Sequence, residues 1–140
     1  MVDLGERPEP VTFVHEIRVR YGECDMQRVV FNAHYMAYCD DAVDTWFRHV
    51  LTPDGEGFES LGFDFMLKTA TITWHAPLVF GETGALACSV ERWGNASFDV
   101  RVEGSAAGAP RFTALITYVS VMPGANTPTR IPEIVRDRLS

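Results

Sequence analysis

Apolar and polar residues alternate at the start of the chain. In an extended segment over residues 12–20, one side is mainly charged and the other carries Phe13, His15, Ile17 and Val19. A period of two is typical of a strand with one buried face. The pattern therefore predicts a first strand in this segment.

A long amphipathic helix is predicted after this strand. Beyond Asn32, apolar residues recur at steps of three and four, and charged residues occupy the opposite side. The apolar stripe consists of Tyr35, Met36, Cys39, Ala42, Val43, Trp46, Phe47 and Val50. Asn32 is a suitable N-cap, because its side-chain oxygen can accept an N–H of the first turn. We expect about five turns, ended by the proline- and glycine-rich residues 52–57.

The rest of the chain has the composition of strands. Segments rich in β-branched and aromatic side chains are separated by turn signals. The predicted strands cover residues 65–75, 84–93, 96–102 and 111–122, after a short turn at 58–62. Gly94-Asn95 indicates a tight hairpin, and the small residues 104–110 indicate a wider turn. Pro132 suits the first position of a short terminal helix.

The order of strand, helix and four strands predicts an α+β protein. The one available partner for the apolar stripe of the helix is a single curved antiparallel sheet of five strands. Such a sheet leaves an open edge, which dimerisation would cover. Because the 140 residues contain neither repeat nor linker, we expect one domain over 1–140, with residues 1–10 as a loose lead-in.

Composition and charge exclude several classes of protein. With 46% apolar and 22% charged residues the chain is typical of globular proteins, and its apolar runs are too short to cross a bilayer. Its start lacks the basic and apolar regions of a secretory signal, so we expect a cytoplasmic protein. The net charge of −7 argues against binding to nucleic acid or anionic membranes. Three cysteines without CxxC spacing argue against a disulfide scaffold or a metal site.

Residues 20–35 carry the candidate chemistry. Asp25 lies in a polar loop just ahead of the predicted helix, whose N-terminus presents unpaired N–H groups and a positive dipole. Such an end can stabilise an oxyanion, and a neighbouring carboxylate can act on an electrophilic carbonyl. Carboxylates before helices also serve as caps and turn formers. Spacing alone therefore leaves both roles open.

The same segment resembles the signature of the 4-hydroxybenzoyl-CoA thioesterase family of hotdog proteins. The aromatic-x-acid-x-Asp turn, the short loop and the helical Tyr of that signature are matched by Tyr21, Glu23, Asp25, Asn32 and Tyr35. The likeness continues through residues 75–82, 93–98 and 130–133, and so covers nearly the whole chain. The family has Gly at the position of Arg28, where a backbone with φ > 0 would be strained for arginine.

This resemblance implies the hotdog fold, in which the sheet wraps around one long helix, and it implies thioester hydrolysis. The substrate would be an acyl-CoA or an acyl-carrier protein, with no cofactor and no metal. Asp25 would act as nucleophile or as general base on water, in a partly dry pocket. The backbone N–H of Asn32 or of its neighbour would polarise the carbonyl, and His34 is a further candidate. The site would lie at the interface of a homodimer, and such dimers would pair into tetramers.

Other residues offer alternatives for the catalytic role. Asp40, Asp41 and Asp44 lie on the polar side of the helix, from which a second branch of the family takes its acid. A solvated face is the commoner role for such residues. Cys24 is a conceivable nucleophile, but it has no base partner in sequence, and a lone cysteine is more often a buried small side chain. Glu23 would pair with a neighbouring arginine.

Coenzyme A carries phosphates, so we expect arginines at the mouth of the pocket. The candidates are Arg28, Arg92, Arg101, Arg111 and Arg130. The sequence does not rank these arginines. Each of them could equally be an ordinary surface residue.

Two other functions are compatible with a hotdog fold, because one fold hosts several functions. A non-catalytic domain would bind an acyl thioester as a sensor or scaffold, but it has no use for a loop carboxylate beside the carbonyl. A dehydratase would need a His-rich Phe-Pro-Gly type motif at the helix entry, and the sequence lacks it.

Overall fold

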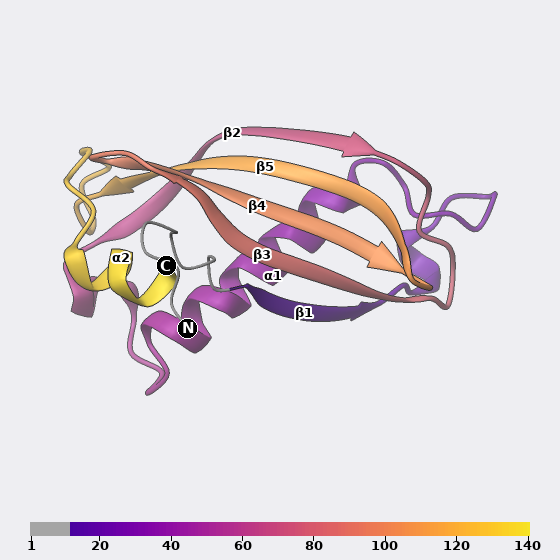
Figure 1. Cartoon of the computed structure of the whole chain (residues 1–140), viewed down its shortest axis with the longest axis horizontal. Coiled ribbons are helices and arrows are strands. Elements are labelled where there is room, and N and C mark those ends of the chain that lie inside the picture. Colours follow the sequence, from indigo (N-terminus) through magenta and orange to yellow (C-terminus); the bar gives the residue numbers. More distant parts are fainter. Residues whose placement is uncertain (1–11) are drawn as a thin grey trace, which may run out of the picture.

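The computed structural model describes residues 12–140 and has the predicted order of strand, long helix, four strands and short helix (Figure 1). The elements are β1 (Phe13–Arg18), the 3-10 turn η1 (Tyr21–Glu23), α1 (His34–Leu51), the 3-10 turn η2 (Phe58–Leu61), β2 (Asp64–Trp74), β3 (Thr83–Trp93), β4 (Ser97–Ala106), β5 (Ala109–Val121) and α2 (Glu133–Leu139). Among these residues, no helix combines the length and the apolar character needed to span a membrane.

The five strands form one antiparallel sheet in the order β1-β3-β4-β5-β2. α1 runs along one face of this sheet (Figure 1). β2 follows α1 in the chain but pairs with β5, so β1 and β2 occupy opposite edges of the sheet. The hotdog fold expected from the sequence is confirmed.

The hydrophobic core lies between α1 and the sheet. Along β3, β4 and β5, buried residues alternate with less buried ones, because successive side chains of a strand point to opposite faces. Burial of each large apolar side chain stabilises the fold by about 1.5–3 kcal/mol. The largest fully buried side chains include Tyr35, Trp46, Phe47, Phe63, Phe98 and Phe112. Most of the predicted stripe of α1 is buried, but Met36 and Val50 are only partly buried. Tyr38 and Leu51 are additional buried members.

The predicted capping role of Asn32 is wrong. Ala33 stands at the N-cap position of α1, with φ and ψ of −68° and −18°, and no side chain caps the helix. The chain enters α1 through a backbone turn, in which the N–H of His34 donates to the carbonyl of Phe31 (2.8 Å). Because this turn already has helical geometry, the extended conformation of a capping residue does not form.

Two boundaries also differ from the prediction. β4 runs to Ala106 and β5 starts at Ala109, so the turn between them has two residues, with φ of 52° and 74°. Two residues with positive φ match the twist of paired strands, and this compact turn replaces the wider one expected at 104–110. α2 begins at Glu133, and Pro132 precedes it as the N-cap.

Figure 1 shows that different segments occupy the two ends of the sheet. The loop after β1, the start of α1 and the corner between β2 and β3 lie at one end, and α2 lies at the other. The N–H of Val19 donates to the carbonyl of Glu82 (2.8 Å) and joins the loop to the corner. We call residues 19–33 and 75–82 together the loop end.

Candidate functional site

A small hairpin at the loop end carries Asp25. Its N–H donates to the carbonyl of Val29 (2.9 Å), and its carbonyl accepts the N–H of Arg28 (3.0 Å). A three-residue hairpin loop of this kind ends in a residue with positive φ, where Gly is preferred. Arg28 adopts a φ of 63° there. The positive φ that the sequence analysis considered at this position is therefore present, with arginine in place of glycine.

The carboxylate of Asp25 has one oxygen engaged and one available. Oδ1 accepts the N–H of Gln27 (2.8 Å), in an Asx turn that fixes the side chain. Oδ2 has no hydrogen-bond or ion-pair partner among residues 12–140. Asp25 is exposed in the single chain, so the partly dry pocket expected around it does not form within one copy.

Asp25 shares a cavity of about 360 Å³ with the entry of α1. The lining residues are Gly22, Glu23, Cys24, Asp25, Phe31, Ala33, His34 and Ala37. Within the described part of the chain, the N–H groups of Asn32 and Ala33 donate no hydrogen bond. Asp25, with its free carboxylate oxygen, therefore lines the same cavity as Ala33, one of the two residues whose N–H is unpaired.

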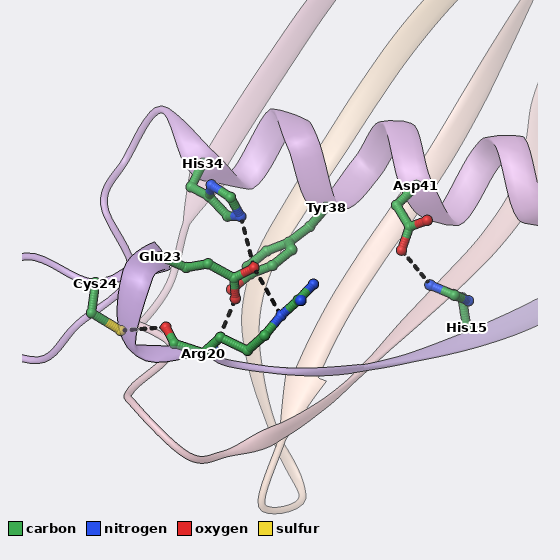
Figure 2. A network of polar contacts seen from close by, with 7 residues as sticks. All are labelled: His15, Arg20, Glu23, Cys24, His34, Tyr38 and Asp41. Carbon is green, nitrogen blue, oxygen red and sulfur yellow. Dashed lines mark hydrogen bonds and ion pairs between the residues drawn. The ribbon is translucent and has the colours of Figure 1, made fainter.

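The Glu23 carboxylate connects the loop to α1 (Figure 2). Oε1 accepts the backbone N–H of Arg20 (2.9 Å) and the Tyr38 hydroxyl (2.8 Å), and Oε2 lies 3.2 Å from Nε2 of His34. The side chain of Glu23 is only 13% exposed. Burial disfavours its charged form, but the hydrogen bonds from Arg20 and Tyr38 and the nearby His34 outweigh burial and lower the pKa of Glu23.

Sequence reasoning missed the functional contact of Tyr38 and much of the role of Glu23. The predicted pairing of Glu23 with an arginine is present, with Arg20 Nε at 3.6 Å, but it is the weakest of four contacts. Because His34 and Tyr38 are four residues apart, they lie on the same face of α1. That spacing was the signal that both could reach one loop carboxylate.

A larger cleft of about 530 Å³ lies next to this cavity, along β1 and α1. Glu23, His34 and Ala37 line both spaces. Farther along the cleft, Nε2 of His15 lies 2.8 Å from Oδ2 of Asp41 (Figure 2). The Asp25 cavity thus adjoins a polar cleft that carries charges of both signs.

The alternative nucleophile Cys24 is poorly prepared for attack. Its thiol lies 3.5 Å from the carbonyl of Arg20. Burial, together with the charges of Glu23 and Asp25, raises the pKa of this thiol. A raised pKa lowers the thiolate fraction, and the thiolate is the nucleophilic form.

The helix carboxylates lie away from the Asp25 cavity. Asp40, Asp41 and Asp44 are exposed, and none of them lines that cavity. Asp44 pairs with Arg48 one helical turn later (3.0 Å), and Asp41 contacts His15. Their positions fit a solvated helix face.

The arginines predicted to contact coenzyme A lie in three separate places. Arg28 belongs to the Asp25 hairpin. Arg92 pairs with Asp99 (2.9 Å) near the far end of β3, about 30 Å along the strand from the loop end. Arg101 pairs with Glu103 (3.1 Å) and alternates with buried residues of β4, so it lies on the face of the sheet turned away from α1.

Comparison with known proteins identifies the family. Residues 19–139 match the model of the Thioesterase-like superfamily. Among curated proteins, none matches the sequence significantly. Similar solved structures include a thioesterase-superfamily protein from Jannaschia sp. (TM-score 0.85, 21% identity, covering 96% of this chain and 95% of that one). A gentisyl-coenzyme A thioesterase gives a TM-score of 0.80 at 22% identity, with 91% and 100% covered. A 1,4-dihydroxy-2-naphthoyl-CoA thioesterase from Synechocystis gives 0.77 at 19% identity, with 92% and 96% covered.

The chain belongs to the Thioesterase-like superfamily, because the family model covers most of its length. The structural neighbours share its fold from end to end. Family membership supports thioester hydrolysis as the general activity.

Proposed function

We propose that this protein hydrolyses acyl-CoA thioesters, with Asp25 as the catalytic carboxylate. One observation carries the proposal: Asp25, whose Oδ2 is unpaired among the described residues, lines the same cavity as Ala33 at the entry of α1, where the N–H groups of Ala33 and the preceding Asn32 are also unpaired. A carboxylate and an oxyanion-stabilising group on one cavity are what acyl transfer requires.

The reaction uses these groups in a defined order. The thioester carbonyl oxygen accepts hydrogen bonds from the N–H groups of Asn32 and Ala33, which stabilise the negative charge that develops on it. As a nucleophile, Asp25 forms a bond to the carbonyl carbon, the carbon–sulfur bond breaks, and water hydrolyses the resulting anhydride. As a general base, Asp25 instead takes a proton from the attacking water, and the departing thiolate finally receives a proton. Both routes yield a free acid and a thiol.

His34 is assigned to substrate orientation. Its ring lies at the wall shared by the Asp25 cavity and the larger cleft. The contact with Glu23 at 3.2 Å fixes the position of Nε2. A histidine held by a carboxylate is oriented for one hydrogen-bonding role, which supports binding of the thioester arm beside Asp25.

A homodimer would complete the site. β2 lies at an edge of the sheet, and nine of its eleven residues are exposed. Exposed Met66, Leu67 and Trp74 lie along it, and a long apolar edge strand is a template for pairing. A second copy on this edge would also remove water from the exposed loop end, and two such dimers would form the tetramer.

The narrower assignment is to enzymes like 4-hydroxybenzoyl-CoA thioesterase, in a cytoplasmic setting and as a single domain. The matching signature residues support it, because Glu23 and Asp25 both line the cavity at the entry of α1. Tyr35 supports it as well, since its buried hydroxyl accepts the N–H of Leu78 (3.0 Å) and so connects the helix to the corner of the loop end.

The test is hydrolysis by the purified protein over a panel of aromatic and aliphatic acyl-CoAs, followed by release of free thiol. Asp25→Asn should abolish turnover with the fold intact, and Asp44→Asn is the matched control on the solvated helix face. An Asp25→Asn protein with wild-type turnover would remove Asp25 from the mechanism. Binding of acyl-CoA without turnover would favour the alternative, a non-catalytic hotdog domain that acts as sensor or scaffold.

A further inference from the structure

A shallow depression on the loop end is separate from the Asp25 cavity. It has a volume of about 320 Å³, and its lining residues are Arg18, Val19, Arg20, Tyr21, Phe80 and Gly81. This volume is at the lower end of the range for small-molecule sites. Tyr21 is four residues from Asp25, and four residues span at most about 14 Å. The depression therefore lies within reach of a ligand whose other end is at Asp25.

The charge of the depression differs from that of the whole chain. The chain has a net charge of −7, yet the depression is lined by two arginines and no acidic residue. Among residues 12–140, Arg18 has no acidic side chain within ion-pair distance, and the only such contact of Arg20 is the 3.6 Å approach to Glu23. Both side chains are exposed.

The acidic side chain at the corner between β2 and β3, Glu82, is already paired with an arginine. Glu82 follows Gly81, a lining residue of the depression, in the sequence. Its two carboxylate oxygens accept hydrogen bonds from the two terminal nitrogens of Arg111 (2.7 and 2.8 Å). The same pair lowers the pKa of Glu82, so this carboxylate stays charged and paired. Arg18 therefore has no acidic partner among residues 12–140, and Arg20 has only the 3.6 Å approach to Glu23, so both exposed guanidinium groups can reach a ligand in the depression.

Two aromatic rings complete the lining. Tyr21 is 78% exposed and Phe80 is 47% exposed, and the two rings meet edge to face with centroids 5.8 Å apart. The N–H of Phe80 donates to the carbonyl of Arg28 (2.9 Å), which holds this ring beside the Asp25 hairpin. Exposed rings at fixed positions are platforms on which a nucleic-acid base can stack.

We propose that this depression binds the nucleotide part of coenzyme A. The adenine stacks on Tyr21 or Phe80, and the phosphates accept hydrogen bonds from the guanidinium groups of Arg18 and Arg20, which match phosphate geometry. The phosphopantetheine arm then leads from the depression along the loop to Asp25. This inference rests on the proposed function, and it selects coenzyme A over a carrier protein, which presents no adenine.

The first experiment measures binding without hydrolysis. Adenosine 3′,5′-bisphosphate carries the base and phosphates but no thiol, and it is titrated into the isotopically labelled full-length protein. Amide signals of residues 18–21 and 79–82 should shift, and the affinity should fall with added salt, because exposed charge pairs are screened. Absence of binding, or shifts confined to other residues, would overturn the proposal.

The second experiment compares variants by calorimetric titration with coenzyme A. Arg18→Gln and Phe80→Leu should each weaken binding about tenfold, the effect of losing a charge-assisted hydrogen bond or a stacked base. Arg48→Gln is the matched control, since it removes one exposed arginine on α1 far along the chain and should leave affinity unchanged. Thermal unfolding shows whether each variant is folded. Equal affinities for wild type and both site variants would contradict the inference.

The third experiment separates this inference from the proposed function. Thiol release is compared between an acyl-CoA and the same acyl group on pantetheine, which lacks phosphates and adenine. Arg18→Gln should raise the KM for the acyl-CoA about tenfold and leave the pantetheine thioester unchanged. An equal loss on both substrates would refute the nucleotide site while thioesterase activity stands. Nucleotide binding without any hydrolysis would retain the site and refute the proposed function.

Discussion

At the end of the molecule where α2 lies, Ile131, Val135 and Leu139 are buried in the common core. There the guanidinium groups of Arg136 and Arg138 donate to backbone carbonyls of Gly94 and Leu51. At the loop end, by contrast, the exposed apolar side chains include Tyr21, Met26, Phe31 and Phe80. Polar groups at the entry of α1 also lack partners among residues 12–140.

This difference separates the two ends by role. At the α2 end, the apolar side chains are buried in the core and the arginines donate to backbone carbonyls, so these side chains stabilise the fold. At the loop end, one oxygen of Asp25 and the N–H groups at the entry of α1 have no partner among residues 12–140. Arg18 at the end of β1 is exposed, and Arg20 approaches only Glu23, at 3.6 Å. These exposed groups are accessible to a ligand. Substitutions at the α2 end should therefore change stability, and those at the loop end should change binding and turnover.

The largest effect should come from Asp25→Asn. Asparagine keeps an oxygen that can accept the N–H of Gln27 but has no negative charge to act on carbonyl or water, so turnover should fall by about 10²–10⁴-fold. The melting temperature should stay within a few degrees of wild type. Thiol release and a thermal melt on the same preparation check both parts. A large loss of stability would show that Asp25 contributes to the fold. It would contradict the expectation that substitutions at the loop end change turnover and not stability.

The opposite pattern is expected for Ile131→Ala at the α2 end. Ile131 is fully buried, and the cavity left by truncation should lower the free energy of unfolding by about 2–5 kcal/mol. KM and kcat measured well below the melting temperature should be unchanged. Urea unfolding monitored by circular dichroism gives the stability. A selective rise in KM would show that the two ends are coupled.

Glu23→Gln should affect both properties, because Glu23 joins the loop to α1. Loss of the charged acceptor should lower the free energy of unfolding at neutral pH by about 1–3 kcal/mol and weaken turnover. The folded-state pKa of Glu23 lies below its ordinary value of 4.5. Its contribution is therefore complete above pH 4.5 and is lost as the pH falls through the lower folded-state pKa.

The difference in stability between Glu23→Gln and wild type should accordingly shrink as the pH is lowered from 4.5. Unfolding measured over a pH series tests this. Glu133→Gln is the control, since its partner Arg130 is exposed and the pair should contribute less than about 1 kcal/mol. A pH-independent difference would show that Glu23 acts through packing rather than through its charge.

The smallest effect should be a gain in stability from Arg28→Gly. Arg28 has a φ of 63°, and a non-glycine side chain there costs about 1–2 kcal/mol, so glycine should stabilise the fold by about 1 kcal/mol after its greater unfolded-state freedom is included. Asn126, with φ of 51° near the other end, is the matched site. Asn126→Gly should gain less, because asparagine tolerates this conformation. Thermal melts compare the two variants.

Much of the fold follows from local patterns in the sequence. The alternation ending at Arg20 and the helical stripe from Tyr35 to Val50 were sufficient to predict the first strand and α1, because their periods reflect which faces are buried. Asp25 was singled out by its place before the helix and by the resemblance of its loop. Boundaries were less accurate where a backbone turn competes with a side-chain cap, as at Asn32.

Tertiary structure alone decided which distant residues meet. The antiparallel pairing of β1 with β3 places Arg18 opposite Thr83 and so brings the corner containing Phe80 beside the loop containing Tyr21. The folding of α1 over β1 brings Tyr38 and His34 to Glu23. These contacts join segments far apart in the chain, and the sequence encodes them through the packing of the whole sheet rather than through any local period. The sequence thus determined the fold class and singled out Asp25 as a candidate, and the three-dimensional packing determined the surroundings in which Asp25 lies.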